Sequence, residues 1–205
     1  MSTDSIFYNW FGFNEELFLL INGIHSPGLD QLMSLVTSLG HPQLFPFYIM
    51  LALVLMWYKP VSMSQQNVVT FSVSYILISA IIVPLLKQSF DFPRPLTVLG
   101  EKSVVLLGHP DIIHSFPSGH SAFAVLMAAS LAPGLPLFGK VMIIAFAFLV
   151  CLSRIIVGAH FPVDVLGGAL ISLLVVFSVR FILGTEKKST ADRISIANRL
   201  NNVSD

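Results

Sequence analysis

Apolar stretches separated by short polar turns dominate the chain. Several are near the length that a helix needs to cross a hydrocarbon core of about 30 Å. These stretches are residues 43–58, 67–86, 119–133, 138–157 and 163–184. Stretch 119–133 is short and rich in Ala and Ser, which suits a helix packed inside a bundle. Pro84 is expected to bend the helix of residues 67–86 near its end.

The two ends of the chain follow different patterns. Residues 1–16 are polar and aromatic, which is typical of a segment at the headgroup level. Residues 17–39 are apolar but broken by Asn22 and Pro27, so they form either a bent first span or two half-helices packed on the bundle. We therefore predict an all-α fold, a polytopic membrane helical bundle of about six transmembrane helices, in a membrane domain over 1–184. The polar tail 185–205 is expected to be partly helical or disordered, and no chemistry is assigned to it.

Composition supports a membrane protein. Of 205 residues, 55% are hydrophobic and 11% charged, with a mean hydropathy of +0.81, whereas soluble domains carry about 25% charged residues. Basic and acidic residues balance at eleven each, so no global field indicates a nucleic-acid partner. The single cysteine, Cys151, excludes disulfides within the chain and cysteine-based metal sites. No cleavable signal is apparent, because the N-terminus carries acidic residues such as Asp4 instead of a basic region.

Basic residues predict the orientation in the membrane. One side of the predicted topology collects Lys59, Lys140, Lys187, Lys188, Arg193 and Arg199, and the other holds Lys87, Arg94 and Lys102. The first group is expected to be cytoplasmic together with the C-terminus. The loop 87–118 would then face the periplasm or the cell exterior, with the protein in the cell (inner) membrane.

This topology gathers three polar clusters on the outer face. The first runs from Lys87 to Arg94 and Pro95, the second from Ser115 to His120, and the third joins Ser153 and Arg154 to His160 and Asp164. Charged residues at membrane depth are expensive and indicate function. Three cations, two histidines and a carboxylate are therefore expected to converge.

The cations and the second cluster suit a phosphate. Lys87, Arg94 and Arg154 would form a cationic cradle, although each alone also fits a snorkelling anchor. Ser118 and Gly119 stand at a predicted helix start, where free N–H groups and the helix dipole favour an anion. An ordinary turn and N-cap is the alternative there.

The two histidines suit proton transfer and nucleophilic attack. Pro162 is expected to begin a helix, which puts His160 just before it and Asp164 in its first turn. The Asp164 carboxylate would accept a hydrogen bond from one ring nitrogen and leave the other as a nucleophile or base. A loop histidine that caps its own helix is the alternative. His120 would donate a proton to a leaving oxygen, or be a helix-start histidine satisfied by water.

Jointly, the clusters resemble the type-2 phosphatidic acid phosphatase superfamily of integral membrane lipid phosphatases. The family pattern is Lys, six residues, Arg-Pro; then Pro-Ser-Gly-His; then Ser-Arg, five residues, His, three residues, Asp. The chain matches every fixed position, at 87–95, 117–120 and 153–164. The resemblance implies that His160 attacks phosphorus to give a phosphohistidine and that Asp164 orients it. It also implies that His120 protonates the leaving group, while Lys87, Arg94, Ser118, Gly119 and Arg154 hold the phosphoryl oxygens.

The resemblance also narrows the substrate to a membrane lipid phosphate. The short chain and its Asn14–Asn22 segment are most similar to small bacterial undecaprenyl diphosphate phosphatases, which serve cell-wall synthesis. Related members act on phosphatidylglycerophosphate, phosphatidate or lipid A phosphates. A vanadate haloperoxidase and a non-enzymatic lipid-binding or transport protein are the alternatives from other classes. No cofactor or metal is expected, because three cations carry the charge and no compact ligand spacing appears. The oligomeric state stays open.

Four further histidines lie outside the motifs: His25, His41, His109 and His114. We interpret all four as structural or interfacial, with His114 the first exception to consider because it adjoins the second cluster. Asp91 and Asp111 are loop acids that would influence substrate choice.

Overall fold

The computed structural model describes residues 6–58, 63–108 and 114–201, and within these ranges it describes side chains from Tyr8 to Gly184. The N-terminal part contains α1 (Ile6–Asn9), the 3-10 turn η1 (Trp10–Gly12), α2 (Phe13–Asn22), α3 (Pro27–Leu39), η2 (Pro42–Leu44) and α4 (Phe45–Tyr58). The rest contains α5 (Gln65–Tyr75), the π-helical segment η3 (Ile76–Ile82), α6 (Val83–Phe90), α7 (Pro95–Leu99), α8 (Gly119–Leu131), α9 (Leu137–Ile156) and α10 (Pro162–Asn201). The described residues are thus helical throughout their regular structure, as predicted.

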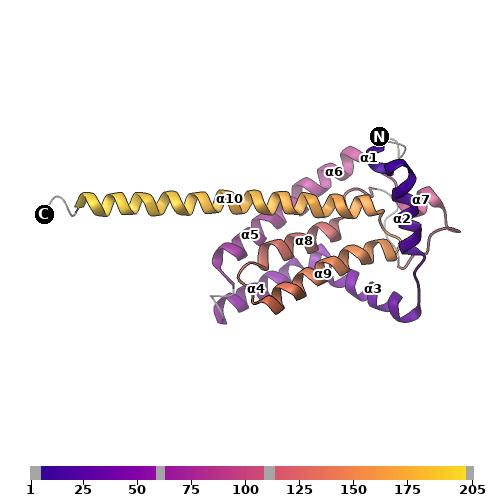
Figure 1. The fold of residues 1–205 in the computed structure, drawn as a ribbon, viewed down its shortest axis with the longest axis horizontal. Coiled ribbons are helices and arrows are strands. Elements are labelled where there is room, and N and C mark those ends of the chain that lie inside the picture. The colour runs from indigo at the N-terminus through magenta and orange to yellow at the C-terminus, as the bar shows by residue number, and fades with distance from the viewer. Residues whose placement is uncertain (1–5, 59–62, 109–113, 202–205) are drawn as a thin grey trace.

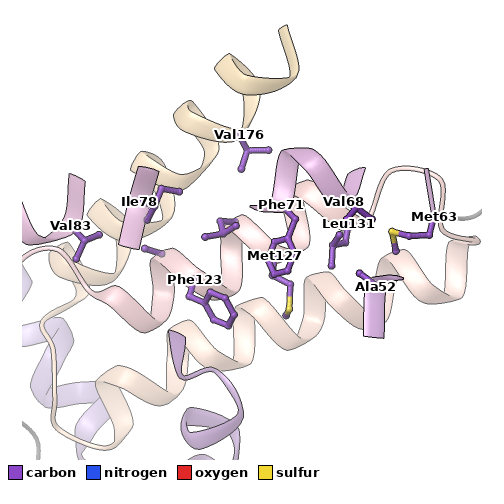
Figure 2. Close-up of a cluster of buried hydrophobic side chains, with 12 residues drawn as sticks. Ala52, Met63, Val68, Phe71, Ile78, Val83, Phe123, Met127, Leu131 and Val176 are labelled. Carbon is purple, nitrogen blue, oxygen red and sulfur yellow. The ribbon is translucent and has the colours of Figure 1, made fainter. Parts of the chain in front are cut away.

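Helix α8 is the centre of the bundle (Figure 1). It packs against α5, α9 and α10, and most of its residues are buried. Figure 2 shows Met127 of α8 beside Phe71 of α5 in the main apolar cluster. The ring of Phe123, also on α8, lies 6.3 Å from that of Phe71. Small residues along α8 let its neighbours approach closely, so the prediction of an interior helix here is confirmed.

Within the described ranges, three helices are long and apolar enough to cross a membrane: Gln65–Leu99, Leu137–Ile156 and Pro162–Gly184. A fourth crossing arises if Pro27–Leu39 and Pro42–Tyr58 are one span bent by 54°. Residues 17–39 therefore form no single span: α2 ends at Asn22, and α3 continues into α4 through the break at Gly40 and His41. Six crossings stays a prediction, because α2 and α8 are shorter than a span.

Large apolar side chains cover the outside of the bundle. Phe148 is 66% exposed, Phe177 64% and Phe181 76%. Such surface is unfavourable in water and is the ordinary outer surface of a membrane bundle.

The π-helical part of the span Gln65–Leu99 lies directly before a proline. Pro84 lies in the first turn of α6, directly after the π segment Ile76–Ile82. Proline has no N–H to donate and its ring crowds the carbonyl one turn earlier, which accounts for the departure from α-helical geometry there.

Helix α10 continues without a break from the last span to Asn201, so most of the polar tail is helical. Figure 1 shows this helix extending well beyond the bundle. Lys59, His109 and Asp111, used above for orientation or as loop candidates, lie outside the described residues, as do the side chains of Lys187, Lys188, Arg193 and Arg199.

Candidate active site

Residues from all three clusters line one cavity of about 480 Å³. From the predicted site these are Lys87, Arg94, Gly119, His120, Arg154 and His160. A second wall comes from the break between α3 and α4 and includes Thr37, Ser38, His41 and Pro42. Among the lining residues that the structure describes there is no Asp or Glu, and three of them are cations.

A tight turn brings His160 to the cavity. α9 ends at Ile156, and Pro162 occupies the first turn of α10, as predicted. Gly158 has φ +76°, and a Cβ there would stand 2.5 Å from the Val105 carbonyl oxygen, so only glycine fits. The backbone N–H of His160 donates to the Arg154 carbonyl at 3.2 Å. The ring is thereby held at a fixed point, 2% exposed.

Asp164 lies behind His160, with Ser115 between them. The distance from His160 Nδ1 to Asp164 Oδ2 is 3.5 Å, at the outer limit of a hydrogen bond. Ser115 Oγ is 3.3 Å from the same Nδ1 and donates to Asp164 Oδ2 at 2.5 Å. The predicted pairing is therefore supplemented by a hydroxyl that sequence reasoning left without a role. Because Nδ1 of His160 faces Asp164 and Ser115, Nε2 is the ring nitrogen that is available to the cavity.

A tyrosine from the N-terminal segment completes the shell around Asp164. Tyr8 donates its phenolic O–H to Asp164 Oδ1 at 3.0 Å, while the Phe161 N–H donates to Oδ2 at 2.9 Å. Tyr8 is 4% exposed and stacks on Phe92 with ring centroids 4.0 Å apart. Burial and the neighbouring carboxylate raise the pKa of Tyr8 above its ordinary value, so it stays a donor. Tyr8 thus lies in the core, whereas the pattern of residues 1–16 predicts a segment at the headgroup level.

The electrostatics keep His160 uncharged. Burial, reinforced by the charges of Arg94 and Arg154, lowers the pKa of His160 well below its ordinary value. A neutral imidazole keeps a lone pair, which nucleophilic attack requires.

Contacts with neighbouring groups position the three cations. Arg94 Nη1 donates to the Ala159 carbonyl at 3.3 Å, and Lys87 Nζ donates to the His114 carbonyl at 2.9 Å. Arg154 Nη1 donates to the Thr37 hydroxyl. Arg94 and Arg154 are 5% and 7% exposed. The acceptors in these three contacts are two backbone carbonyls and a hydroxyl, all of them neutral groups.

The second cluster lies at the start of α8, as predicted. Ser118 is the N-cap and accepts from the Ser121 N–H and hydroxyl at 3.4 and 3.0 Å. It is fully buried and is not among the lining residues, whereas Gly119 and His120 are. Close contact with α10 fixes this loop: a Cβ on Gly168 would stand 2.5 Å from the Ser118 carbonyl oxygen.

Two asparagines that sequence reasoning left without a role tie the N-terminal helices to the site. Asn22 donates to the carbonyls of Val105 and Ile156, both at 2.9 Å, and Asn14 accepts from the Val163 N–H at 3.1 Å. Both are 1% exposed. Figure 1 shows α2 across the end of the bundle where α10 begins. Helix α2 therefore braces the turn that carries His160.

The remaining described histidines divide into two groups. His25 pairs with Asp30 at 2.7 Å and His114 with Asp91 at 2.8 Å, and neither histidine is itself a lining residue. His41 instead lines the cavity, with its ring 4.8 Å from that of His120 and perpendicular to it. The structural interpretation of His41 therefore misses this position. Over the described ranges, no three His, Cys, Asp or Glu residues form a group that would hold a metal ion.

Comparison with known proteins places this geometry in a family. The profile of the PAP2 superfamily matches residues 68–187. The chain belongs to this superfamily of membrane lipid phosphatases, which are metal-independent hydrolases, and is a multi-pass membrane protein.

Individual relatives carry different names. An undecaprenyl-diphosphatase of Sulfolobus acidocaldarius is 29% identical over 168 residues, which are 81% of this chain and 76% of the relative. Phosphatidylglycerophosphatase B of Bacillus subtilis is 31% identical over 168 residues, 77% of this chain and 76% of the relative. The crystal structure of Aquifex aeolicus LpxE superposes with a TM-score of 0.70 at 34% identity, covering 82% of this chain and 94% of that one.

Proposed function

We propose that the chain removes the terminal phosphate of undecaprenyl diphosphate, through a phosphohistidine on His160, at the outer face of the membrane. The observation that carries this proposal is the cavity that brings His160 and His120 together with three cations. A lipid phosphate is the anionic group that such a site in a membrane bundle would meet.

The reaction balances with groups that line or adjoin the cavity. His160 Nε2 attacks the terminal phosphorus, the bond to the bridging oxygen breaks, and its electron pair leaves with the lipid phosphate. His120 supplies a proton to that oxygen. Water then attacks the phosphorus and gives a proton to His120, the phosphorus–nitrogen bond breaks with its electron pair returning to His160 Nε2, and inorganic phosphate is released.

The cations and the Gly119 N–H would hold the equatorial oxygens as charge develops during transfer. Asp164 would keep the His160 ring in the tautomer that exposes Nε2 and stabilise its positive charge. Ser118, buried behind the cavity wall, would contribute by fixing the start of α8.

Phosphatidylglycerophosphate is the second candidate substrate, supported by the similarity to phosphatidylglycerophosphatase B. The motifs contact only the phosphate, so both lipids fit the same chemistry. The basic residues predicted on one side support an outward-facing cavity and a cytoplasmic C-terminus.

The test is phosphate release by the purified full-length chain in detergent with EDTA present. Undecaprenyl diphosphate, phosphatidylglycerophosphate and phosphatidate are compared at equal concentrations. The proposal predicts the highest kcat/KM for the diphosphate. A preference for phosphatidylglycerophosphate would favour the second candidate, and no release from any lipid would contradict a phosphatase.

A further inference from the structure

One wall of the cavity is built from the break between α3 and α4. A Cβ on Gly40 would stand 2.5 Å from Val150 Cγ1, so glycine lets the break pack directly on α9. The hydroxyl of Tyr48 donates to the Leu39 carbonyl at 2.8 Å, and that of Tyr75 donates to the Pro42 carbonyl at 3.2 Å. The break is therefore a fixed structure, and it presents His41 to the cavity.

A hydrogen bond fixes the tautomer of His41. Its Nδ1 accepts from the Gln43 N–H at 3.1 Å, so in the neutral ring the proton resides on Nε2. The described part of the chain gives Nε2 no hydrogen-bond partner. The perpendicular contact with His120 at 4.8 Å keeps the two rings side by side on the cavity. His41 is thus a donor beside the residue assigned to the leaving group.

The neighbours of His41 are also donors. Arg154 is more than nine-tenths buried, and its Nε has no partner among the residues that the structure describes. The Thr37 hydroxyl accepts from Arg154 Nη1, which leaves its own O–H to donate. A phosphate group offers only acceptors, whereas a glycerol hydroxyl also has to donate, so this wall matches a phosphate.

We propose that His41, on the wall formed by the α3–α4 break, binds the lipid-linked phosphate of a diphosphate substrate while His160 attacks the terminal one. This inference rests on the proposed phosphatase reaction and specifies its substrate as a lipid diphosphate. The lipid-linked phosphate departs with the bridging oxygen, and therefore passes the side of the cavity where His120 and His41 lie.

Two substitutions separate the functions of the two ring nitrogens. His41→Asn places an amide oxygen where Nδ1 accepts from the Gln43 N–H, so it keeps the local turn but removes the Nε2 donor. His41→Gln keeps an N–H donor near the Nε2 position but loses that turn contact. Gln43→Ala, on an exposed side chain of the same turn, is the matched control.

The assay measures kcat/KM of the full-length chain with farnesyl diphosphate and farnesyl monophosphate, which share one lipid chain. A hydrogen bond to a charged group is worth about tenfold to hundredfold in affinity. His41→Asn is expected to lower kcat/KM for the diphosphate by about that factor. For the monophosphate, it should lower kcat/KM several-fold less. His41→Gln retains most of the wild-type ratio of kcat/KM between the diphosphate and the monophosphate, and Gln43→Ala retains all of this ratio.

Inhibition constants give a second readout that does not need turnover of the monophosphate. His41→Asn is expected to raise the constant for inorganic diphosphate more than that for inorganic phosphate. Equal losses on both substrates, or equal changes for both inhibitors, would overturn the subsite and show that His41 acts through His120. Absence of phosphate release by the wild type would instead contradict the proposed function itself.

Discussion

Tyr8→Phe tests whether the N-terminal segment contributes to chemistry at a distance from the cavity. The substitution removes only the hydroxyl that donates to Asp164 Oδ1 at 3.0 Å. In the structure the other donors to this carboxylate, Ser115 and the Phe161 N–H, bond to Oδ2. Oδ1 would therefore stay fully buried without its donor, while the ring keeps its stacking on Phe92.

The size of the effect follows from the charge of the acceptor. A hydrogen bond to a charged group contributes about 1.5–3 kcal/mol, which corresponds to about tenfold to hundredfold in rate if all of it is lost in the transition state. The loss is expected in kcat, because the imidazolium formed on attack depends on Asp164. KM should change little, because Tyr8 is not among the cavity residues.

The assay is steady-state phosphate release by the wild type, Tyr8→Phe and Tyr58→Phe. Tyr58 is the control, because its side chain is 77% exposed and is not among the cavity residues. Wild-type kcat in Tyr8→Phe would refute the positioning role. An equal fall in kcat in Tyr58→Phe would show that the effect does not depend on the hydrogen bond to Asp164.

Two further predictions concern protonation and packing. Because the pKa of His160 is below its ordinary value of 6.5, the nucleophile stays neutral in mild acid. The fall of kcat/KM that protonation of His160 causes should therefore occur below pH 6.5. A fall that begins above this pH would contradict the lowered pKa. The unfolded chain takes up this proton near its ordinary pKa and the folded chain does not, so His160 should make stability fall as pH drops below that value. Gly168→Ala should reduce both activity and melting temperature, at about 1–3 kcal/mol for overpacking, because its Cβ meets the Ser118 carbonyl at 2.5 Å. Gly139→Ala, whose Cβ would be 3.4 Å from its nearest neighbour, should leave both unchanged, and equal melting temperatures for the two variants would argue against the tight contact.

Local signals in the sequence were sufficient to predict where the helices that carry the motifs begin. Pro162 begins α10 because proline suits the first turn of a helix, and Ser118 caps α8 as its type predicts. These boundaries fix where His160, Asp164 and His120 emerge. The prediction that the three clusters surround one cavity required one further assumption, namely that all three lie on the same side of the membrane.

Contacts that depend on tertiary packing could not be predicted in the same way. Tyr8 and Asp164 are 156 positions apart, and no periodicity in residues 1–16 indicates which core the tyrosine enters. Asn14 and Asn22 looked like polar interruptions, yet each satisfies backbone groups at the other end of the chain. His41 was missed for the same reason, since only the 54° bend between α3 and α4 brings it to the cavity.

The covalent intermediate is the most direct test of the central claim that His160 is the nucleophile. Full-length protein is mixed with a lipid phosphate labelled in its terminal phosphate, quenched rapidly in alkali and digested. The account predicts label that is stable to alkali, lost in acid and confined to the peptide containing His160, and absent in a folded His160→Ala variant. Label on another residue, or undiminished turnover in His160→Ala, would contradict the account.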